Sequence, residues 1–170
     1  EGIEAGATWQ WTIDNGRNWS TSSSDTSATI ALTGDGEKTF KVKVTDRAGN
    51  TTEKVKVTNN SGVFVEADAL SFTLDTTKPA LPTVTLEDDT GSGPHDKTTN
   101  IGKVKVEGIE AGATWQWTID NGRNWSTSSS DTSATITLTG DGEKTFKVKV
   151  TDRAGNTTEK VKVTNNSGVF

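Results

Sequence analysis

The sequence predicts an all-β fold built from tandem β-sandwich domains, and two observations lead to this prediction. Residues 1–64 recur at 107–170 with one difference, Ala31 against Thr137, so the chain carries a repeat with a period of 106 residues. That period is the size of one independently folding domain and is too long for the common solenoid repeats. Within the repeat, apolar residues alternate with polar ones over short runs, which is the pattern of strands with one buried face.

Six such runs follow one another in the second copy. Their apolar members are Val84 and Leu86; Val104 and Val106; Trp115, Trp117 and Ile119; Ala134, Ile136 and Leu138; Phe146, Val148 and Val150; and Val161 and Val163. Short strands at this spacing, joined by turn-rich connections, are typical of an antiparallel sandwich of the immunoglobulin type. We expect these residues to face the core, and Ala31 and Thr137 to lie on an outward face.

The repeat also predicts domain boundaries. A linker at 74–79 separates residues 1–74, a partial domain without its first strands, from residues 75–170, a nearly complete domain without its last strand. The 25 residues from Thr51 to Asp75 are far longer than one sandwich edge at about 3.3 Å per residue. An additional hairpin is therefore expected, with its turn at residues 59–62, Asn-Asn-Ser-Gly.

Composition excludes several kinds of site and partner. With no cysteine and one histidine, His95, the chain has neither disulfides nor thiol nucleophiles nor a cysteine or histidine metal site, and His95 is expected to be an inert loop residue. A formal net charge of -5 argues against a nucleic-acid partner. No apolar run approaches the roughly 18 residues that cross a bilayer, and no leader-like segment opens the chain, so we expect a soluble fragment without membrane insertion.

One motif is known from enzymes. Residues 12–19, repeated at 118–125, fit the pattern Ser/Thr-x-Asp-x-Gly-x-x-Trp of the Asp box of sialidases. Physically the motif is a hairpin device, because Asn-Gly supplies positive-φ positions and the Asp carboxylate accepts backbone N–H groups of the turn. A glycosidase needs two carboxyls about 5 to 9.5 Å apart, which one turn aspartate per repeat does not supply. We therefore expect no enzyme.

The tryptophans and lysines have two interpretations each. Trp9 and Trp11 alternate like core residues, whereas a sugar-stacking platform needs exposed rings, for which Trp19 and Trp125 are the better candidates. The lysines at 41, 43, 54 and 56 resemble a basic patch in the linear sequence. On alternating strands they are solvated outer faces that also protect sheet edges from aggregation.

The acidic residues suggest a metal site. In an immunoglobulin sandwich the linker and two loops share one pole, and this places together the side chains of Asp75, Glu107, Glu110, Asp152 and Asn156. Asp35 and Glu37 are expected to face them from the first domain. Such oxygen donors suit calcium, which would remove the repulsion between carboxylates and stiffen the junction; a solvated acidic rim without an ion is the alternative. Asp88, Asp89 and Asp96 form a second candidate cluster.

Three segments together carry a resemblance over the whole chain. These are Leu-Asp-Thr-Thr-Lys-Pro at 74–79, Thr-Asp-Arg-Ala-Gly-Asn-Thr-Thr at 45–52 and 151–158, and the Thr-Trp strand followed by Asp-Asn-Gly. In this order they resemble the bacterial immunoglobulin-like repeats of giant biofilm-associated and repeats-in-toxin adhesins. The resemblance implies a bacterial cell-surface stalk, exported to the extracellular side, with calcium at its domain junctions.

The expected function is thus a non-catalytic extender that supports cell adhesion and biofilm formation. Its expected partners are neighbouring identical repeats of the same chain, and the ligand of the parent adhesin is left open. Two alternatives remain at this stage: a carbohydrate-binding module that uses exposed tryptophan, and an accessory domain of a surface glycosidase.

Overall fold

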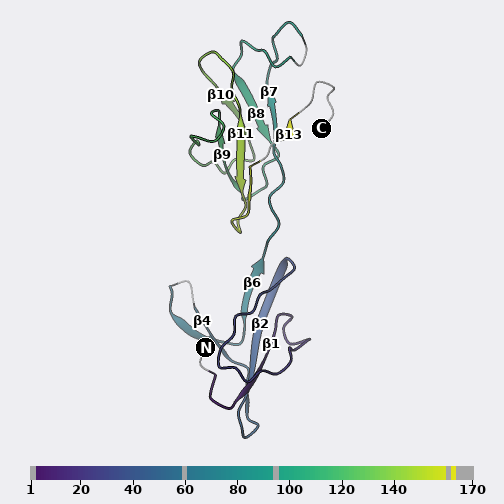
Figure 1. Ribbon diagram of the computed structural model, residues 1–170, viewed down its shortest axis with the longest axis vertical. Helices are drawn as coiled ribbons and strands as arrows, with labels where there is room; N and C mark the ends of the chain where they lie inside the picture. The colour runs from purple at the N-terminus through teal and green to yellow at the C-terminus, as the bar shows by residue number, and fades with distance from the viewer. Residues whose placement is uncertain (1–2, 59–60, 94–95, 160–161, 164–170) are drawn as a thin grey trace. The chain divides into compact units, whose positions relative to one another are not determined.

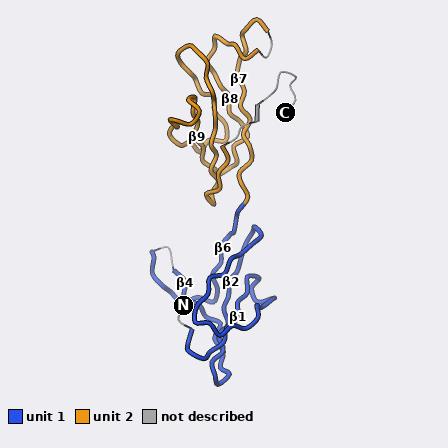
Figure 2. Tube along the Cα trace, viewed as in Figure 1, with its two compact units in different colours: residues 1–76 blue, residues 77–170 orange. Residues whose placement is uncertain are grey.

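The computed structural model describes residues 3–58, 61–93, 96–159 and 162–163. In these residues the chain forms strands and loops, and it divides into two compact units, Glu1–Thr76 and Thr77–Phe170 (Figures 1 and 2). This division lies two residues after the expected boundary between 74 and 75. Within the described ranges there is no helix of the length and apolarity that crossing a membrane requires.

Unit 2 contains two sheets. The first has the strand order β10-β8-β7-β13 and consists of β7 (Thr83–Leu86), β8 (Lys103–Glu107), β10 (Ser133–Thr137) and β13 (Lys162–Val163). Its pairs are antiparallel except β13 with β7, which is parallel. The two inner strands are β8, which pairs with β10 and β7, and β7, which pairs with β8 and β13.

The second sheet of unit 2 has the order β12-β11-β9. It consists of β9 (Thr114–Thr118), β11 (Lys147–Thr151) and β12 (Thr157–Thr158), all antiparallel. Apolar residues of both sheets and of the loop between them form one buried cluster: Val84, Val104, Val106, Ile109, Ala113, Trp115, Val148 and Val150. The predicted immunoglobulin-like β-sandwich is confirmed.

Among the described residues, the alternation pattern predicts this core correctly and fails at one position. Ile119 is 36% exposed, because β9 ends at Thr118 and the chain turns there, so the two-residue period stops one residue earlier than the sequence pattern suggests. Phe146 lies just before β11, yet it packs against the core as predicted, half-buried and with its ring stacked on Trp117 at 5.6 Å. Val161 lies outside the described residues.

Unit 1 is built around one long strand, β2 (Gly36–Thr45). The second half of β2 pairs with β1 (Thr8–Thr12) and, at its end, with β3 (Thr51–Thr52). Its first half pairs with β6 (Leu70–Leu74).

A separate hairpin of unit 1 joins β4 (Val55–Thr58) to β5 (Phe64–Ala67). This confirms the additional hairpin predicted between Thr51 and Asp75. Asn59 and Asn60 of its expected turn lie outside the described residues.

The core of unit 1 is much smaller than that of unit 2. Ala7 and Trp9 are its buried hydrophobic residues in the described part, 2% and 7% exposed, against eight such residues in unit 2. In unit 2, β7 and β8 supply Val84, Val104 and Val106 to the core, and these strands lie outside the segment that units 1 and 2 have in common, residues 1–64 and 107–170. Ala31 and Thr137 are both exposed, as expected for an outward face.

Candidate functional site

Topology brings four of the expected calcium ligands to one end of unit 2. Glu107 ends β8 and Glu110 lies in the short loop that leads to β9. Asp152 and Asn156 lie in the turn that follows β11, whose last residue, Thr151, pairs with the first residue of β9, Thr114. We call this end the acidic pole of unit 2.

Two of these four residues contact each other. Asp152 Oδ1 accepts the Asn156 backbone N–H at 2.8 Å, and Asp152 Oδ2 accepts the Asn156 side-chain amide at 2.9 Å. Burial opposes ionisation of Asp152, yet the hydrogen bonds from Asn156 prevail and leave its pKa below the ordinary value. Asp46 and Asn50 make the same pair of contacts in unit 1, each at 2.8 Å. The carboxylate therefore organises the turn.

The other two residues of the pole face solvent. The Glu107 carboxylate pairs with Lys105 Nζ at 2.8 Å, which raises the pKa of Lys105. Glu110 is exposed, and its backbone carbonyl accepts the N–H of Ala113 at 3.1 Å. In the described ranges no three His, Cys, Asp or Glu side chains are grouped so that they could hold a metal ion. A calcium site thus stays a prediction.

The expected ligands of the first domain lie at one end of unit 1. Asp35 Oδ1 accepts both the backbone N–H of Thr76 at 2.9 Å and its hydroxyl at 2.7 Å. Glu37 is exposed on β2, opposite Thr73 of β6. Asp75, which the sequence placed with the pole of the second domain, belongs to this first unit.

The second candidate cluster lies in the loop between β7 and β8. Asp89 Oδ2 accepts the backbone N–H of Lys97 at 3.0 Å, while Asp89 Oδ1 is buried without a hydrogen-bond partner. The Asp96 carboxylate accepts the backbone N–H groups of Thr98 at 2.8 Å and Gly93 at 3.0 Å, which lower its pKa. Asp88 contributes its backbone carbonyl, which accepts the Thr99 hydroxyl at 2.8 Å. His95 lies outside the described residues.

The Asp box forms the predicted turn. Buried Thr118 donates its hydroxyl to Asp120 Oδ1 at 2.6 Å and accepts the Gly122 N–H at 3.3 Å. The Asp120 carboxylate also accepts the backbone N–H and the side-chain amide of Asn124, at 2.9 and 2.6 Å. These hydrogen bonds, that of Thr118 foremost, hold the pKa of Asp120 well below its ordinary value. The backbone at Asn121 and Gly122 has φ of 63° and 94°, as the hairpin interpretation requires.

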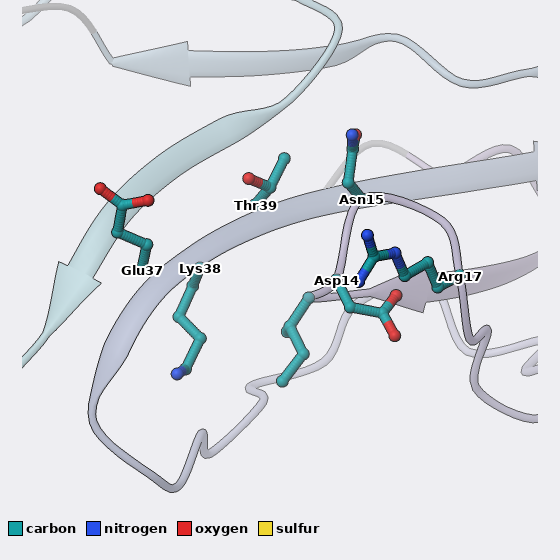
Figure 3. A pocket seen from close by; sticks show the side chains of 7 residues that line it. Asp14, Asn15, Arg17, Glu37, Lys38 and Thr39 are labelled. Carbon is teal, nitrogen blue, oxygen red and sulfur yellow. The ribbon is translucent and has the colours of Figure 1, made fainter.

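The same motif in unit 1 borders a shallow hollow of about 570 Å³ (Figure 3). The hollow is lined by Ile13, Asp14, Asn15, Arg17, Glu37, Lys38 and Thr39. The carboxylates of Asp14 and Glu37 point away from each other in Figure 3, and Asp14 is held by Thr12 and Asn18. Asp14 and Glu37 therefore do not face one bond from two sides, as the two carboxyls of a glycosidase do.

The tryptophans form no flat exposed platform in the described residues. Trp9 is buried and its indole N–H donates to the carbonyl of Asp25 at 2.8 Å, whereas Trp11 is half-buried and stacks on Phe40 at 6.1 Å. Trp19 is half-buried, and Lys43 Nζ lies 4.6 Å from its ring centre.

Unit 2 has the matching contact, in which Lys149 Nζ lies 4.8 Å from the centre of the Trp125 ring. We expected Lys43 to be purely a solvated outer-face residue and missed its contact with Trp19. This cation–π contact forms because the loop packs against the strand, and no motif in the sequence indicates it.

Two family models match the chain, and both are described as bacterial Ig-like domain. One covers residues 77–165, more than half of the chain, and the other covers residues 10–61. The chain belongs to the bacterial Ig-like domains. The first model spans nearly all of unit 2. The second begins within β1 of unit 1 and ends after β4. A comparison with curated proteins finds no match. Bacterial Ig-like domains are generally structural modules of surface or extracellular proteins.

Proposed function

We propose that this chain is part of a non-catalytic extender of a bacterial cell-surface adhesin, in which repeated Ig-like domains hold a distant binding region away from the cell. The observation that carries the proposal is the repeat itself: residues 1–64 and 107–170, each part of an Ig-like domain, are copies of one segment 106 residues apart and differ at one exposed position. A spacer needs many equal, self-contained units. A binding site or an active site does not require such copies.

The chemistry of the carboxylates supports a passive role. Asp14, Asp46, Asp120 and Asp152 each accept several hydrogen bonds within their own turn. These bonds lower their pKa values and keep the groups ionised at neutral pH. A general acid needs the opposite, a raised pKa. The most conspicuous acidic residues of both units therefore stabilise turns.

Calcium at the domain junctions is the second part of the proposal. Glu110 is exposed at the acidic pole of unit 2, in the loop next to the Asp152 turn, and its side chain is open to an ion. Asp35, Glu37 and Asp75 supply further oxygens at one end of unit 1, and neighbouring repeats of the same chain are the partners. The loop of Asp88, Asp89 and Asp96 is the competing location, supported by the unsatisfied Asp89 Oδ1.

The test compares the chain in calcium and in EGTA. We expect calcium to raise the melting temperature and to stiffen the chain in small-angle scattering, with an affinity of about 0.1 to 1 mM by calorimetry. Glu110→Gln should weaken binding. Glu143→Gln should not, because this exposed residue precedes β11 at its other end.

The outcomes separate the parts of the proposal. Identical melting and identical scattering in calcium and EGTA would remove calcium from it. Loss of the response in Asp89→Asn, with an unchanged Glu110→Gln, would move the ion into the loop between β7 and β8. Specific binding to a glycan array would contradict the extender role and favour a carbohydrate-binding module.

A further inference from the structure

The sequence contains two Asn-Gly pairs, Asn15-Gly16 and Asn121-Gly122, and each forms the turn of an Asp box. Asn-Gly is the dipeptide in which asparagine deamidates most readily, because glycine has no side chain to hinder attack by its backbone nitrogen. Both asparagines are exposed to water. Sequence and exposure therefore favour deamidation at these two positions, whereas the geometry of the turn opposes it.

Deamidation of an Asn-Gly pair begins with the closure of a five-membered ring. The backbone nitrogen of glycine attacks Cγ of asparagine, and the side-chain amide leaves as ammonia, taking the proton that the backbone N–H gives up. Water then adds to one carbonyl of the resulting succinimide and opens the ring, which leaves aspartate or isoaspartate. Water is the one co-reactant, and the turn gains a negative charge.

The backbone conformation of the turn separates the two atoms that must bond. Asn15 has φ of 62° and Asn121 has φ of 63°, which is the left-handed region, with ψ of about +47°. At this ψ the asparagine Cβ and the following nitrogen lie on opposite sides of the Cα–C bond, whereas ring closure requires them on the same side. The asparagine must therefore leave the left-handed region before it can react.

The nitrogen that would attack is also bonded to a buried hydroxyl. Gly122 N–H donates to Thr118 Oγ1 at 3.3 Å, and Gly16 N–H makes the same bond to Thr12 Oγ1 at 3.2 Å. Both threonines are 1% exposed. A base must remove the N–H proton before the nitrogen can attack, and this hydrogen bond keeps the proton away from water and hydroxide.

The rest of the box holds the threonine in place. Thr118 donates its own hydroxyl proton to Asp120 Oδ1 at 2.6 Å, so its oxygen stays available as an acceptor for Gly122. Asp120 is a poor base for a proton relayed through this hydroxyl, because its hydrogen bonds lower its pKa. A Cβ on Gly122 would lie 3.6 Å from Cζ2 of Trp125, so the indole ring packs beside the same turn.

We propose that Asn15 and Asn121 are modification sites that the Asp box keeps closed: they deamidate when the box opens and are protected while it is formed. Isoaspartate inserts one additional carbon into the main chain, so a unit modified in this way cannot re-form the same turn. The box thus preserves the asparagine that its turn requires. This property belongs to each unit by itself and does not depend on the extender role.

The experiment incubates the full chain at mildly alkaline pH, in native buffer and in urea, and follows deamidation by mass spectrometry. Trypsin releases Asn15 in residues 1–17 and Asn121 in residues 106–123, so the two identical boxes are measured separately. We expect deamidation at both sites to be at least about tenfold slower in native buffer than in urea, because reaction in the folded chain requires local opening.

Thr118→Val removes the acceptor of the Gly122 N–H and should accelerate deamidation of Asn121 in the folded chain at least about tenfold. Asn15 of the same molecule has an intact box and is the matched control, with an unchanged rate. Thr118→Ser keeps the hydroxyl and should restore protection. Amide exchange of β8 reports whether unit 2 stays folded, and Thr12→Val repeats the test in unit 1 with the two sites exchanged.

Three results would overturn the proposal. Equal rates in native buffer and in urea would mean that the box gives no protection. Equal rates at Asn121 and Asn15 in Thr118→Val would show that the hydrogen bond to Gly122 is irrelevant. Equal rates at Asn121 in Thr118→Ser and Thr118→Val would assign the effect to altered packing, since serine retains the hydroxyl.

Discussion

The guanidinium of Arg153 lies against the Cα of Gly112, so that a Cβ at position 112 would overlap its Nε. Gly112 has φ of 86°, a left-handed conformation that favours glycine. Arg47 and Gly6 make the same contact in unit 1. This contact joins the loop before β9 to the turn after β11, and it lies at the acidic pole beside Glu110 and Asp152.

Gly112→Ala should destabilise unit 2 by about 1–2 kcal/mol, because alanine is strained in the left-handed region and its methyl group displaces Arg153. Amide exchange of β9 and β11, followed by NMR, measures the change. In an Arg153→Ala background the backbone strain remains and the overlap is gone, so the penalty should be smaller. An equal penalty in both backgrounds would show that the arginine contact is irrelevant.

Val148→Ala should cost unit 2 about 2–3 kcal/mol, since it removes two buried methyl groups from a closed core. Val42→Ala is the matched control, because Val42 occupies the same sequence position in the open core of unit 1 and is half-buried. Its expected cost to unit 1 is about 1 kcal/mol or less. Urea unfolding of each variant tests the difference, and equal costs would contradict the difference in burial between the two valines.

The Asp boxes predict a dependence of stability on pH. The folded pKa of Asp120 lies below its unfolded value of about 3.9, so its contribution is present above about pH 4 and declines as the pH falls. In Asp120→Asn, the free energy of unfolding of unit 2 should therefore fall less steeply between about pH 5 and 2 than in the wild type. Asp141→Asn, at an exposed position, should leave the slope as in the wild type. A wild-type slope in Asp120→Asn would refute the assignment.

Asp35→Ala should make the last residue of unit 1, Thr76, less protected, because its N–H and hydroxyl both lose their carboxylate acceptor. Amide exchange at Thr76 should accelerate about tenfold, the equivalent of one charge-assisted hydrogen bond at a solvated site. Asp35→Asn retains one oxygen acceptor and should give an intermediate rate. Unchanged exchange in Asp35→Ala would mean that other contacts hold Thr76.

Local hydrogen bonding made the turns predictable from the sequence. The Asp box has the same contacts in both units, with Asp14 and Asp120 each accepting the N–H groups of the asparagine four residues later. The turns of Asp46 and Asp152 also have the same contacts in both units, although we expected Asp152 and Asn156 to be metal ligands and did not predict this turn. Every partner in these turns lies within four residues, so the sequence fixes the geometry wherever the segment stands. The alternating runs likewise sufficed to predict the sandwich and its central valines.

The expected metal ligands illustrate the limit of this approach. Strand order predicted that Glu107, Glu110 and Asp152 would share a pole of unit 2, and the topology agrees. We assigned Asp152 and Asn156 to the metal and missed that these two residues bond to each other, and that Glu107 pairs with Lys105. Whether a carboxylate binds a neighbour in the sequence or a metal depends on side-chain geometry, which residue type alone does not give.

Two pairs of repeated segments show what only the tertiary structure decided. Residues 133–137 form a strand where they pair with β8, whereas residues 27–31, identical at four of five positions, form no strand in the described structure. Conversely, residues 36–40 form the first half of β2 where they pair with β6, while the identical residues 142–146 form no continuous strand. A turn satisfies its hydrogen bonds within itself, whereas a strand satisfies them only on a neighbour. The sequence therefore determined the turns and the pattern of inward residues, and the presence of a partner decided which segments became strands.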